Sequence, residues 1–190
     1  MDAKTRGHRA DDCKECRNVE SLRSRLTKGN FMTDMLVKLY NLPESWPSIS
    51  NLVAPEIKIR KPMGSEKPLV VQWVGENFGE SWRSEMDITF SRSPVSCYIA
   101  QHDQKMVGFA CYDAAALGYF GPTGVAEAFR GKGIGTALLL ACLVEMKLKG
   151  YGYAIIGWAG PQEFYEKAVG AVVIPDSTPG IWKDWLGAAE

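Results

Sequence analysis

The sequence predicts a domain of the α/β or α+β class, with helices flanking a mixed, mostly antiparallel β-sheet. From residue 56 onward, the apolar pattern gives the order β-α-α-β-β-β-α-β-α-β-β. Strand runs with interspersed helices favour three layers, with the sheet in the middle. The 190 residues suit one domain with an arm before it, and an apolar share of 46% suits a filled core.

Composition divides the chain into three expected segments. Residues 1–30 are charged and poor in large apolar groups, so we interpret them as a flexible tail. Residues 31–55 form an N-terminal arm and a proline-rich connector, in which Met35–Pro43 is expected to be a short strand or an extended arm. Residues 56–190 form the main domain.

The main domain is expected to begin with one strand and two helices. Glu56–Pro62 alternates apolar and charged residues, which is the strand period. Gly64–Gly79 has an apolar face at helical spacing, and Ser65 is the expected cap. A second helix is expected at Ser81–Phe90.

Three strands should follow these helices. Val95–Asp103 and Lys105–Ala114 are expected to form a hairpin around the tight turn Asp103–Gln104. Leu117–Ala126 is the third strand, and its Gly-Pro-Thr-Gly run predicts a bulge or kink.

The last part of the chain should alternate helices and strands. Gly133–Lys149 is expected to be a long helix, Tyr153–Ala159 a strand and Pro161–Ala171 a helix with proline in its first turn. Val172–Pro179 and Gly180–Leu186 are expected to close the sheet as a pair of strands.

Bulk charge and hydropathy exclude several classes. Lys plus Arg equals Asp plus Glu at 22 each, whereas a dedicated nucleic-acid binder should carry a basic surplus. No apolar run approaches the roughly 20 residues that cross a bilayer, and the N-terminus lacks a signal-peptide pattern. Five unevenly spaced cysteines do not resemble a disulfide framework. We expect a cytoplasmic protein without a nucleic-acid or membrane partner.

One pair of cysteines has the spacing that metal-binding and redox pairs use. Cys13 and Cys16 form a single Cys-x-x-Cys in the expected tail, and only His8 is close in sequence. Zinc needs further ligands, and the thioredoxin-like setting of a redox pair is absent. We therefore expect no metal site, and the role of this pair stays open.

The stretch "AFRGKGIGTALL" (Ala128–Leu139) is the main chemical feature of the sequence. It joins a strand to a helix, whose first turn leaves about four backbone N–H groups without partners. Glycines let a bulky anion approach these groups, and Arg130 and Lys132 add positive charge. The loop therefore predicts a phosphate or pyrophosphate cradle, although a turn that merely needs glycine is the plainer alternative.

Two common phosphate motifs do not fit this loop. A nucleoside-triphosphate P-loop requires Ser or Thr after Gly-Lys, and Gly133 stands there instead. The dinucleotide fingerprint G-x-G-x-x-G fails because Gly131, Gly133 and Gly135 are spaced two and two, with Thr136 in place of the last glycine.

The loop resembles motif A of the GNAT superfamily of acyl-CoA-dependent N-acyltransferases, whose core is Q/R-x-x-G-x-G/A. Arg130, Gly133 and Gly135 fill its defined positions, with Val125 and Phe129 agreeing on the flank. A second stretch, "GPQEFYEKAVGA" (160–171), resembles the signature of the family's fourth helix. The element order is also that of the family, and the resemblance covers about residues 56 to 190.

The resemblance implies acetyl-CoA as co-substrate and a primary amine as acceptor, either a small molecule or a protein. Its pyrophosphate and thioester would be held by backbone and side-chain groups of the strand end and the glycine loop. These expected cofactor-binding residues are Val125, Arg130, Gly131, Lys132, Gly133, Ile134, Gly135 and Thr136.

The resemblance also places the general acid at Tyr165, which would protonate the departing thiolate. A phenol with a pKa of about 10 can donate to that anion, while the plainer alternative is a tyrosine that only packs beside the cofactor. One position departs from the family, since Trp158 stands where an asparagine is common. Trp158 is therefore a candidate wall of the acyl pocket.

The sequence defines the acceptor-binding residues less closely than the cofactor-binding residues. Helix residues Glu76, Glu80 and Glu85 are candidate bases, although each also suits a solvated helix face. The remaining candidates are aromatic groups near the acceptor or acyl site. The expected substrate residues are Glu76, Glu80, Trp82, Tyr119 and Trp158.

Two other functions remain open at this point. A non-catalytic acyl-CoA sensor or interaction domain would keep the cradle without transfer, and a module for another phosphorylated ligand would need only the loop. The resemblance admits a homodimer because such domains often dimerise. The acceptor, the acyl length and the general base are not specified by the sequence.

Overall fold

A computed structural model describes residues 32–42 and 47–186. From Thr33 onward the described residues belong to one compact unit. The expected tail, with Cys13 and Cys16, lies outside the described residues. Among the residues described, no helix is long and apolar enough to cross a bilayer.

The described residues form seven strands, five α-helices of four residues or more, and several short 3₁₀ turns. The strands are β1 (Met35–Lys38), β2 (Ile57–Arg60), β3 (Cys97–His102), β4 (Lys105–Tyr112), β5 (Tyr119–Val125), β6 (Tyr153–Ile156) and β7 (Val172–Val173). The α-helices are α2 (Pro47–Ser50), α3 (Lys67–Phe78), α4 (Glu80–Thr89), α5 (Ile134–Leu148) and α6 (Gln162–Val169). The 3₁₀ turns are η2 (Leu39–Asn41), η3 (Gly64–Glu66), η4 (Glu127–Phe129) and η5 (Gly180–Trp182).

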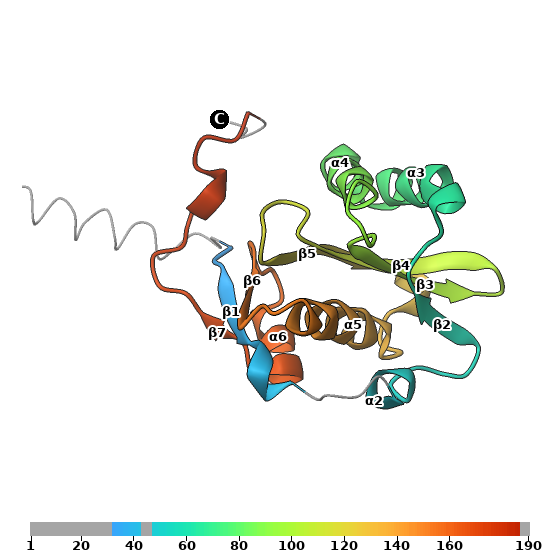
Figure 1. Ribbon diagram of the computed structural model, residues 1–190, viewed down its shortest axis with the longest axis horizontal. Coiled ribbons are helices and arrows are strands. Elements are labelled where there is room, and N and C mark those ends of the chain that lie inside the picture. Colours follow the sequence, from blue (N-terminus) through green and yellow to red (C-terminus); the bar gives the residue numbers. More distant parts are fainter. Residues whose placement is uncertain (1–31, 43–46, 187–190) are drawn as a thin grey trace, which may run out of the picture. The chain divides into compact units, whose positions relative to one another are not determined.

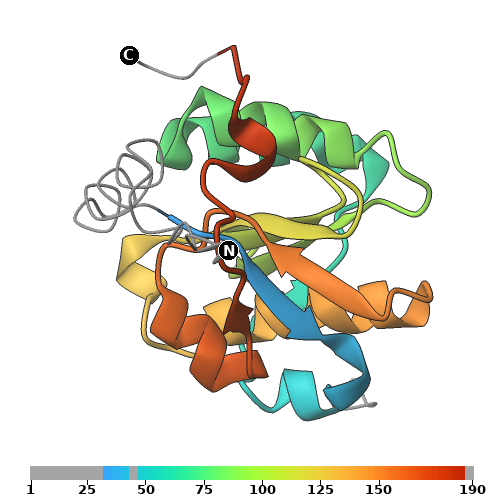
Figure 2. The same ribbon diagram turned by 90° about the vertical axis from the view of Figure 1, so that its left-hand side faces the viewer.

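The strands make one sheet in the order β2-β3-β4-β5-β6-β1-β7. Every pairing is antiparallel except that of β5 with β6. The short strand expected near Met35 is confirmed, and Figure 2 shows β1 (blue) beside β6 (orange). It is an interior strand, so the sheet also takes in residues that precede Glu56.

The three-layer arrangement and the fold class are confirmed. Helices α3 and α4 cover one face of the sheet, and α5 and α6 cover the other (Figure 1). A large buried cluster lies between the sheet and α5, whose apolar residues are buried almost throughout. A smaller cluster under α3 and α4 contains Val74, Met86 and Phe109.

The irregular points of the central strands match the sequence. Asp103 and Gln104 both have positive φ, as a two-residue hairpin turn requires, and they join β3 to β4. The register between β4 and β5 shifts between the pairs Ala110↔Thr123 and Tyr112↔Phe120. One extra residue therefore lies in β5, which is the bulge that its glycines predicted.

The last expected strand is wrong. Gly180–Leu186 contains η5 and turns instead of a strand. Trp182 and Trp185 of this segment pack their rings on Trp158 at the end of β6, so the segment leaves the sheet after the edge strand β7. The expected cap at Ser65 is wrong as well. Helix α3 begins at Lys67 with Glu66 as its N-cap, and Ser65 lies in the preceding turn η3.

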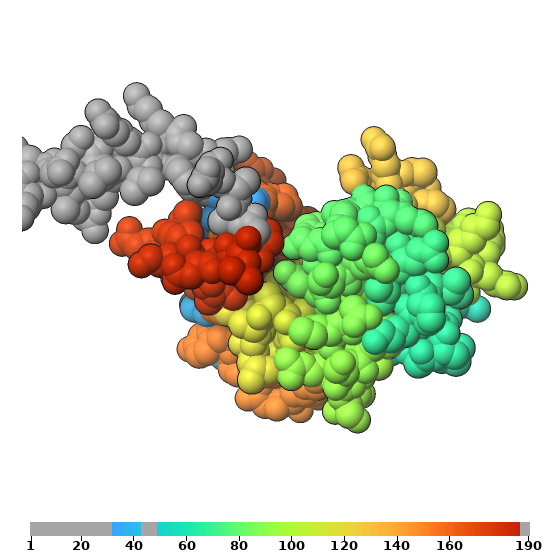
Figure 3. All heavy atoms as spheres, turned by 90° about the horizontal axis from the view of Figure 1, so that it is seen from above, coloured from blue at the N-terminus to red at the C-terminus, as the bar shows by residue number. Residues whose placement is uncertain are grey.

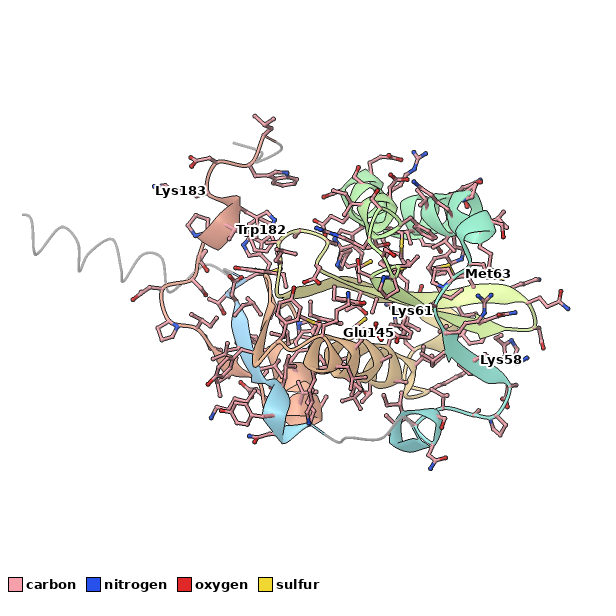
Figure 4. All side chains as sticks on the ribbon, viewed as in Figure 1. Lys58, Lys61, Met63, Glu145, Trp182 and Lys183 are labelled. Atoms are coloured by element: carbon pink, nitrogen blue, oxygen red, sulfur yellow. The ribbon has the colours of Figure 1, made fainter. Side chains whose placement is uncertain are left out.

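A partly buried ion pair joins β2 to α5. Lys61, just after β2, donates to Glu145 Oε1 of α5 at 3.1 Å, and Figure 4 shows the two side chains close together. Tyr98 donates to the other oxygen of Glu145 at 3.0 Å. Burial opposes ionisation of Glu145, but Lys61 and Tyr98 outweigh it and lower its pKa.

Candidate active site

The glycine loop forms an open helix N-terminus directly after β5. Gly131 and Gly133 have φ values of 74° and 77°, in the left-handed region that favours glycine. A Cβ at Gly133 would also collide with the carbonyl oxygen of Leu52, whereas one at Gly131 would meet open space. No side chain caps α5, so its first N–H groups are available to an anion.

Two cationic side chains flank this helix terminus. Arg130 is exposed, and its Nε donates to the carbonyl of Val125 at 3.2 Å, which fixes the start of the loop to the end of β5. The ammonium of Lys132 lies 4.8 Å from the centre of the Phe129 ring. Together with the helix dipole, these charges suit a pyrophosphate.

Next to the loop, β5 and β6 stop pairing. Their parallel ladder covers only Tyr119↔Ile155 and Phe120↔Ile156, after which β6 ends while β5 continues to Val125. The N–H of Ala126 donates to the carbonyl of Val107 on β4 at 2.8 Å. Because such bonds alternate along an antiparallel ladder, the N–H of Val125 points away from β4, toward the side that β6 has left.

Tyr165 lies on α6 across from this divergence. Its side chain is almost fully buried, and its ring meets Phe120 of β5 edge-on with centroids 6.4 Å apart. Burial raises the pKa of Tyr165 to about 12, so its hydroxyl stays protonated at neutral pH. Within the described residues this hydroxyl has no hydrogen-bond partner, which leaves the proton available for donation.

The expected acceptor residues of the helices do not gather at one point. Glu76 accepts from Gln72 at 2.7 Å and lines a surface pocket with Arg60. Glu80 is exposed and pairs with Arg83 within α4. Neither glutamate touches the diverging strands in any contact described, and both are exposed to solvent.

Trp82 lies nearer to the strands, in an aromatic layer under the helices. It stacks on Phe78 with centroids 5.4 Å apart, and Phe78 in turn contacts Phe109 of β4. A Cβ at Gly124 would come within 2.5 Å of the Phe78 ring. Phe78 therefore packs on β5 at Gly124, the residue before Val125. Trp82 stacks on the Phe78 ring.

The structure does bring Tyr119 and Trp158 together, through a residue that the sequence did not single out. Asp34, which is 4% exposed, accepts the Trp158 N–H on Oδ1 at 3.0 Å. Its Oδ2 accepts the Tyr119 hydroxyl at 3.4 Å. Burial, and then the nearby Asp34 carboxylate, raise the pKa of Tyr119. Asp34 was missed because nothing in one sequence places the residue before β1 beside the end of β6.

Trp158 is held in an unusual backbone conformation at this point. Its φ is 45°, which is strained for a bulky residue and persists only where neighbours fix it. Besides the bond to Asp34, its indole N–H donates to the carbonyl of Pro179 at 3.3 Å. Its ring packs on Trp182 with centroids 4.8 Å apart. The C-terminal segment therefore lies against the end of β6.

No group of three or more His, Cys, Asp or Glu side chains within residues 32–42 and 47–186 is arranged to hold a metal ion. The three described cysteines, Cys97, Cys111 and Cys142, are buried and unpaired. Burial raises the pKa of the Cys97 thiol to about 11, so it is not a reactive thiolate.

The fold and this site define an α/β protein with an open helix terminus, flanked by two cationic side chains, beside two diverging strands. A model of the acetyltransferase (GNAT) family matches residues 67–171. That match covers more than half of the chain, and the chain belongs to the GNAT family of acyltransferases. A search of curated proteins finds no match.

Solved structures share the fold at low identity. A GCN5-related glucosamine N-acetyltransferase region in a fungal multi-domain GH3 β-N-acetylglucosaminidase aligns with a TM-score of 0.65 and 16% identity, over 86% of this chain and 22% of that one. A GCN5-related N-acetyltransferase from Sphaerobacter thermophilus aligns with a TM-score of 0.58 and 20% identity, over 82% of this chain and 53% of that one. A GCN5-related N-acetyltransferase from Kribbella flavida aligns with a TM-score of 0.53 and 14% identity, over 75% of this chain and 54% of that one.

These three matches support the fold and nothing finer. The chain spans about a fifth of the first protein and about half of the other two.

Proposed function

We propose that this chain is an N-acetyltransferase that moves an acetyl group from acetyl-CoA to a primary amine by direct attack on the thioester. The observation that carries the proposal is the open N-terminus of α5, with its two left-handed glycines, beside the point where β5 and β6 diverge. Membership of the GNAT family supports the same reaction class.

The residues present fit the diphosphate of a coenzyme A ester. The first-turn N–H groups of Ile134, Gly135 and Thr136 would bind its oxygens, and Arg130 and Lys132 would add charge. A side chain at Gly131 would fill the open space in front of the loop. Acetyl-CoA, when bound, supplies an activated thioester and a leaving thiolate.

Main-chain groups of β5 would align the acyl arm and polarise its carbonyl. The edge of β5 beyond Phe120 is unpaired with β6 and is free to bond an amide-bearing chain. The Val125 N–H points to that edge and would stabilise the oxyanion as the amine attacks. A preorganised donor of this kind is typically worth about 3 kcal/mol of barrier.

Tyr165 would complete the transfer as general acid. The amine nitrogen forms a bond to the carbonyl carbon, the carbon–sulfur bond breaks, and the thiolate takes the Tyr165 proton. The phenolate then recovers a proton from solvent, and the excess proton on the nitrogen is also lost to solvent. The raised pKa of Tyr165, about 12, keeps the acid loaded before each turnover.

The acceptor would enter from the face that carries α3 and α4. Phe78 and Trp82 lie over Gly124 on that face, whereas Tyr165 lies on α6 on the opposite face. The amine would thereby add to the carbonyl carbon from one side, and the tetrahedral intermediate would expel the thiolate toward Tyr165 on the other side. The acceptor is a small-molecule or protein amine.

Amine-dependent thiol release from acetyl-CoA tests the proposal. The acceptor panel contains polyamines, amino acids, aminoglycosides and lysine peptides, and calorimetry measures acetyl-CoA binding separately. Release with at least one amine supports the enzyme. Binding without release on any amine favours the non-catalytic sensor, and the absence of binding rejects both.

A further inference from the structure

One buried carboxylate, that of Asp34, joins β5 to β6 where the two strands diverge. Its Oδ1 accepts the Trp158 N–H at 3.0 Å, and its Oδ2 accepts the Tyr119 hydroxyl at 3.4 Å. Tyr119 is the first residue of β5, and Trp158 lies just beyond the last residue of β6. The C-terminal segment packs against the same corner, since the Trp182 ring lies 6.0 Å from that of Tyr119. Figure 3 shows this segment (red) beside the start of β5 (yellow).

The bond to Trp158 holds a turn that takes the chain away from β5. Trp158 has a φ of 45°, which a bulky residue adopts only at a cost in free energy. An extended Trp158 would let β6 continue alongside β5, because the two parallel strands are already in register at Phe120↔Ile156. The Asp34 carboxylate therefore keeps the edge of β5 beyond Phe120 open.

The residue before Asp34 extends this hold to α6. The carbonyl of Thr33 accepts the Ala159 N–H at 2.9 Å, and its hydroxyl oxygen accepts from Gln162 Nε2 at 3.1 Å. Gln162 is the first residue of α6, the helix that carries Tyr165. The short segment before β1 therefore fixes both the end of β6 and the start of α6.

We propose that Asp34 is a positioning residue for the acyl carrier, which holds β6 away from β5 so that the free edge of β5 can bond the carrier's amide-bearing arm. The inference rests on the proposed acyl transfer for the identity of the ligand. Asp34 acts through Trp158 and Tyr119 and not by touching the ligand. It should therefore affect binding of the arm and not binding of the diphosphate, whose expected contacts lie at the N-terminus of α5.

Calorimetry on the full chain with two ligands separates the arm from the diphosphate. Acetyl-CoA carries both groups, whereas adenosine 3′-phosphate 5′-diphosphate carries the diphosphate without the arm. We expect Asp34→Ala to raise the dissociation constant of acetyl-CoA by about tenfold, because binding must then hold open a turn whose buried N–H has lost its acceptor. The dissociation constant of the armless ligand should change by less than about twofold, because its contacts lie at the helix terminus. Asp34→Asn should restore most of the affinity for acetyl-CoA, because its amide oxygen can still accept the Trp158 N–H.

A second buried aspartate provides a matched control. Asp113 is also 4% exposed, and it accepts the Gly118 N–H at 2.8 Å and the Tyr151 hydroxyl at 3.3 Å, from residues that precede β5 and β6. Tyr119→Phe and Tyr151→Phe each remove one hydroxyl that donates to a buried aspartate. We expect Tyr119→Phe to raise the dissociation constant of acetyl-CoA by about threefold, the effect of one hydrogen bond, and Tyr151→Phe to leave it unchanged. This pair decides the point even if Asp34→Ala does not fold.

Weaker binding of acetyl-CoA alone, in Asp34→Ala and Tyr119→Phe, supports the inference. Equal losses for the two ligands, wild-type affinity for acetyl-CoA in both variants, or an equal loss in Tyr151→Phe overturns it, and the proposed function then still stands. If the wild type binds acetyl-CoA but releases no thiol with any amine, the proposed transfer fails while the titrations still decide the role of Asp34. If the wild type binds neither ligand, both proposals are rejected.

Discussion

At the scale of single residues, the proposed chemistry of this site depends on one hydroxyl and one glycine. Tyr165 keeps its proton because its ring is buried between α6 and β5. Gly133 holds a backbone angle that opens the first turn of α5, and it also leaves room for the Leu52 carbonyl. Both residues were recognised in the sequence, but the reason for Gly133 is visible only in three dimensions.

Tyr165→Phe tests the acid role, because phenylalanine keeps the ring and removes only the donor. We expect kcat to fall by more than tenfold with little change in the acetyl-CoA dissociation constant, since the hydroxyl serves the leaving thiolate and not the diphosphate. Stopped-flow thiol release measures the rate of the chemical step, and calorimetry measures the acetyl-CoA dissociation constant. Tyr153→Phe, an exposed position on β6, is the control. An unchanged chemical step would assign Tyr165 to packing alone.

The two motif glycines should respond differently to alanine. Gly133→Ala forces a left-handed angle and a clash with Leu52, and we expect a loss of about 2 kcal/mol or more of unfolding free energy together with acetyl-CoA binding. Gly135→Ala should stay within about 1 kcal/mol and keep binding, because its Cβ would meet Phe164 and Val125 at an ordinary 3.9 Å. Urea unfolding and calorimetry measure both. Equal behaviour of the two variants would refute this account of the loop.

At the scale of elements, β1 fixes the end of β6 at the point where β5 and β6 diverge. The residue before β1, Asp34, accepts from Trp158 and Tyr119, and its own N–H donates to Ser177 Oγ at 2.9 Å. The carbonyl of Thr33 accepts the Ala159 N–H at 2.9 Å. The start of β1 therefore joins β5, β6 and the C-terminal segment.

Removing the Asp34 carboxylate should loosen this junction. We expect Asp34→Ala to lower the unfolding free energy by about 2–3 kcal/mol, because it leaves the Trp158 N–H without its acceptor, and Asp34→Asn by about 1 kcal/mol. Urea unfolding measures both changes. Asp87→Asn, on the surface of α4, should stay within about 0.5 kcal/mol. Wild-type stability in Asp34→Ala would show that the junction is held by packing alone.

The start of α3 should make stability depend on acid pH. Glu66 receives two bonds of 2.7 Å from Arg60 and one from the Met63 N–H, and these lower its pKa to about 2. A lowered carboxylate pKa stabilises the fold above the unfolded value of about 4.3, and the contribution is lost as pH falls toward 2.

Glu66→Gln should therefore be less stable than the wild type by about 1–2 kcal/mol at pH 7, with the difference shrinking as pH falls below about 4. Urea unfolding at a series of pH values measures it. A difference that stays constant down to pH 3 would show that the glutamate acts through packing and not through its charge.

At the scale of the whole molecule, local patterns were enough to predict the fold class and most elements. The glycine loop, the hairpin turn and the bulge in β5 each contain residue types that favour the backbone angles found there, so the sequence indicates each of them. The parts that failed depend on distant pairing. Nothing near residue 35 indicates that β1 lies between β6 and β7. Nothing local to Gly180–Leu186 indicates that its tryptophans pack on Trp158 and do not form a strand.

The acceptor side was the least predictable for the same reason. Glu76 and Glu80 were chosen from a helix pattern that cannot tell an inward from a solvated carboxylate, and both lie apart from the strands. Glu85 lines a cavity together with Trp182 and Trp185, about a hundred residues later in the chain. A cavity built by two distant segments has no local signature in one sequence.

The measurement that tests the central claim most directly is mass-spectrometric detection of an acetylated amine together with thiol release, using acetyl-CoA and the amines of the acceptor panel. The account predicts one acetylated product per thiol released and a loss of more than tenfold in rate with Tyr165→Phe. Acetyl-CoA binding with neither product nor thiol, for every amine of the panel, would contradict it.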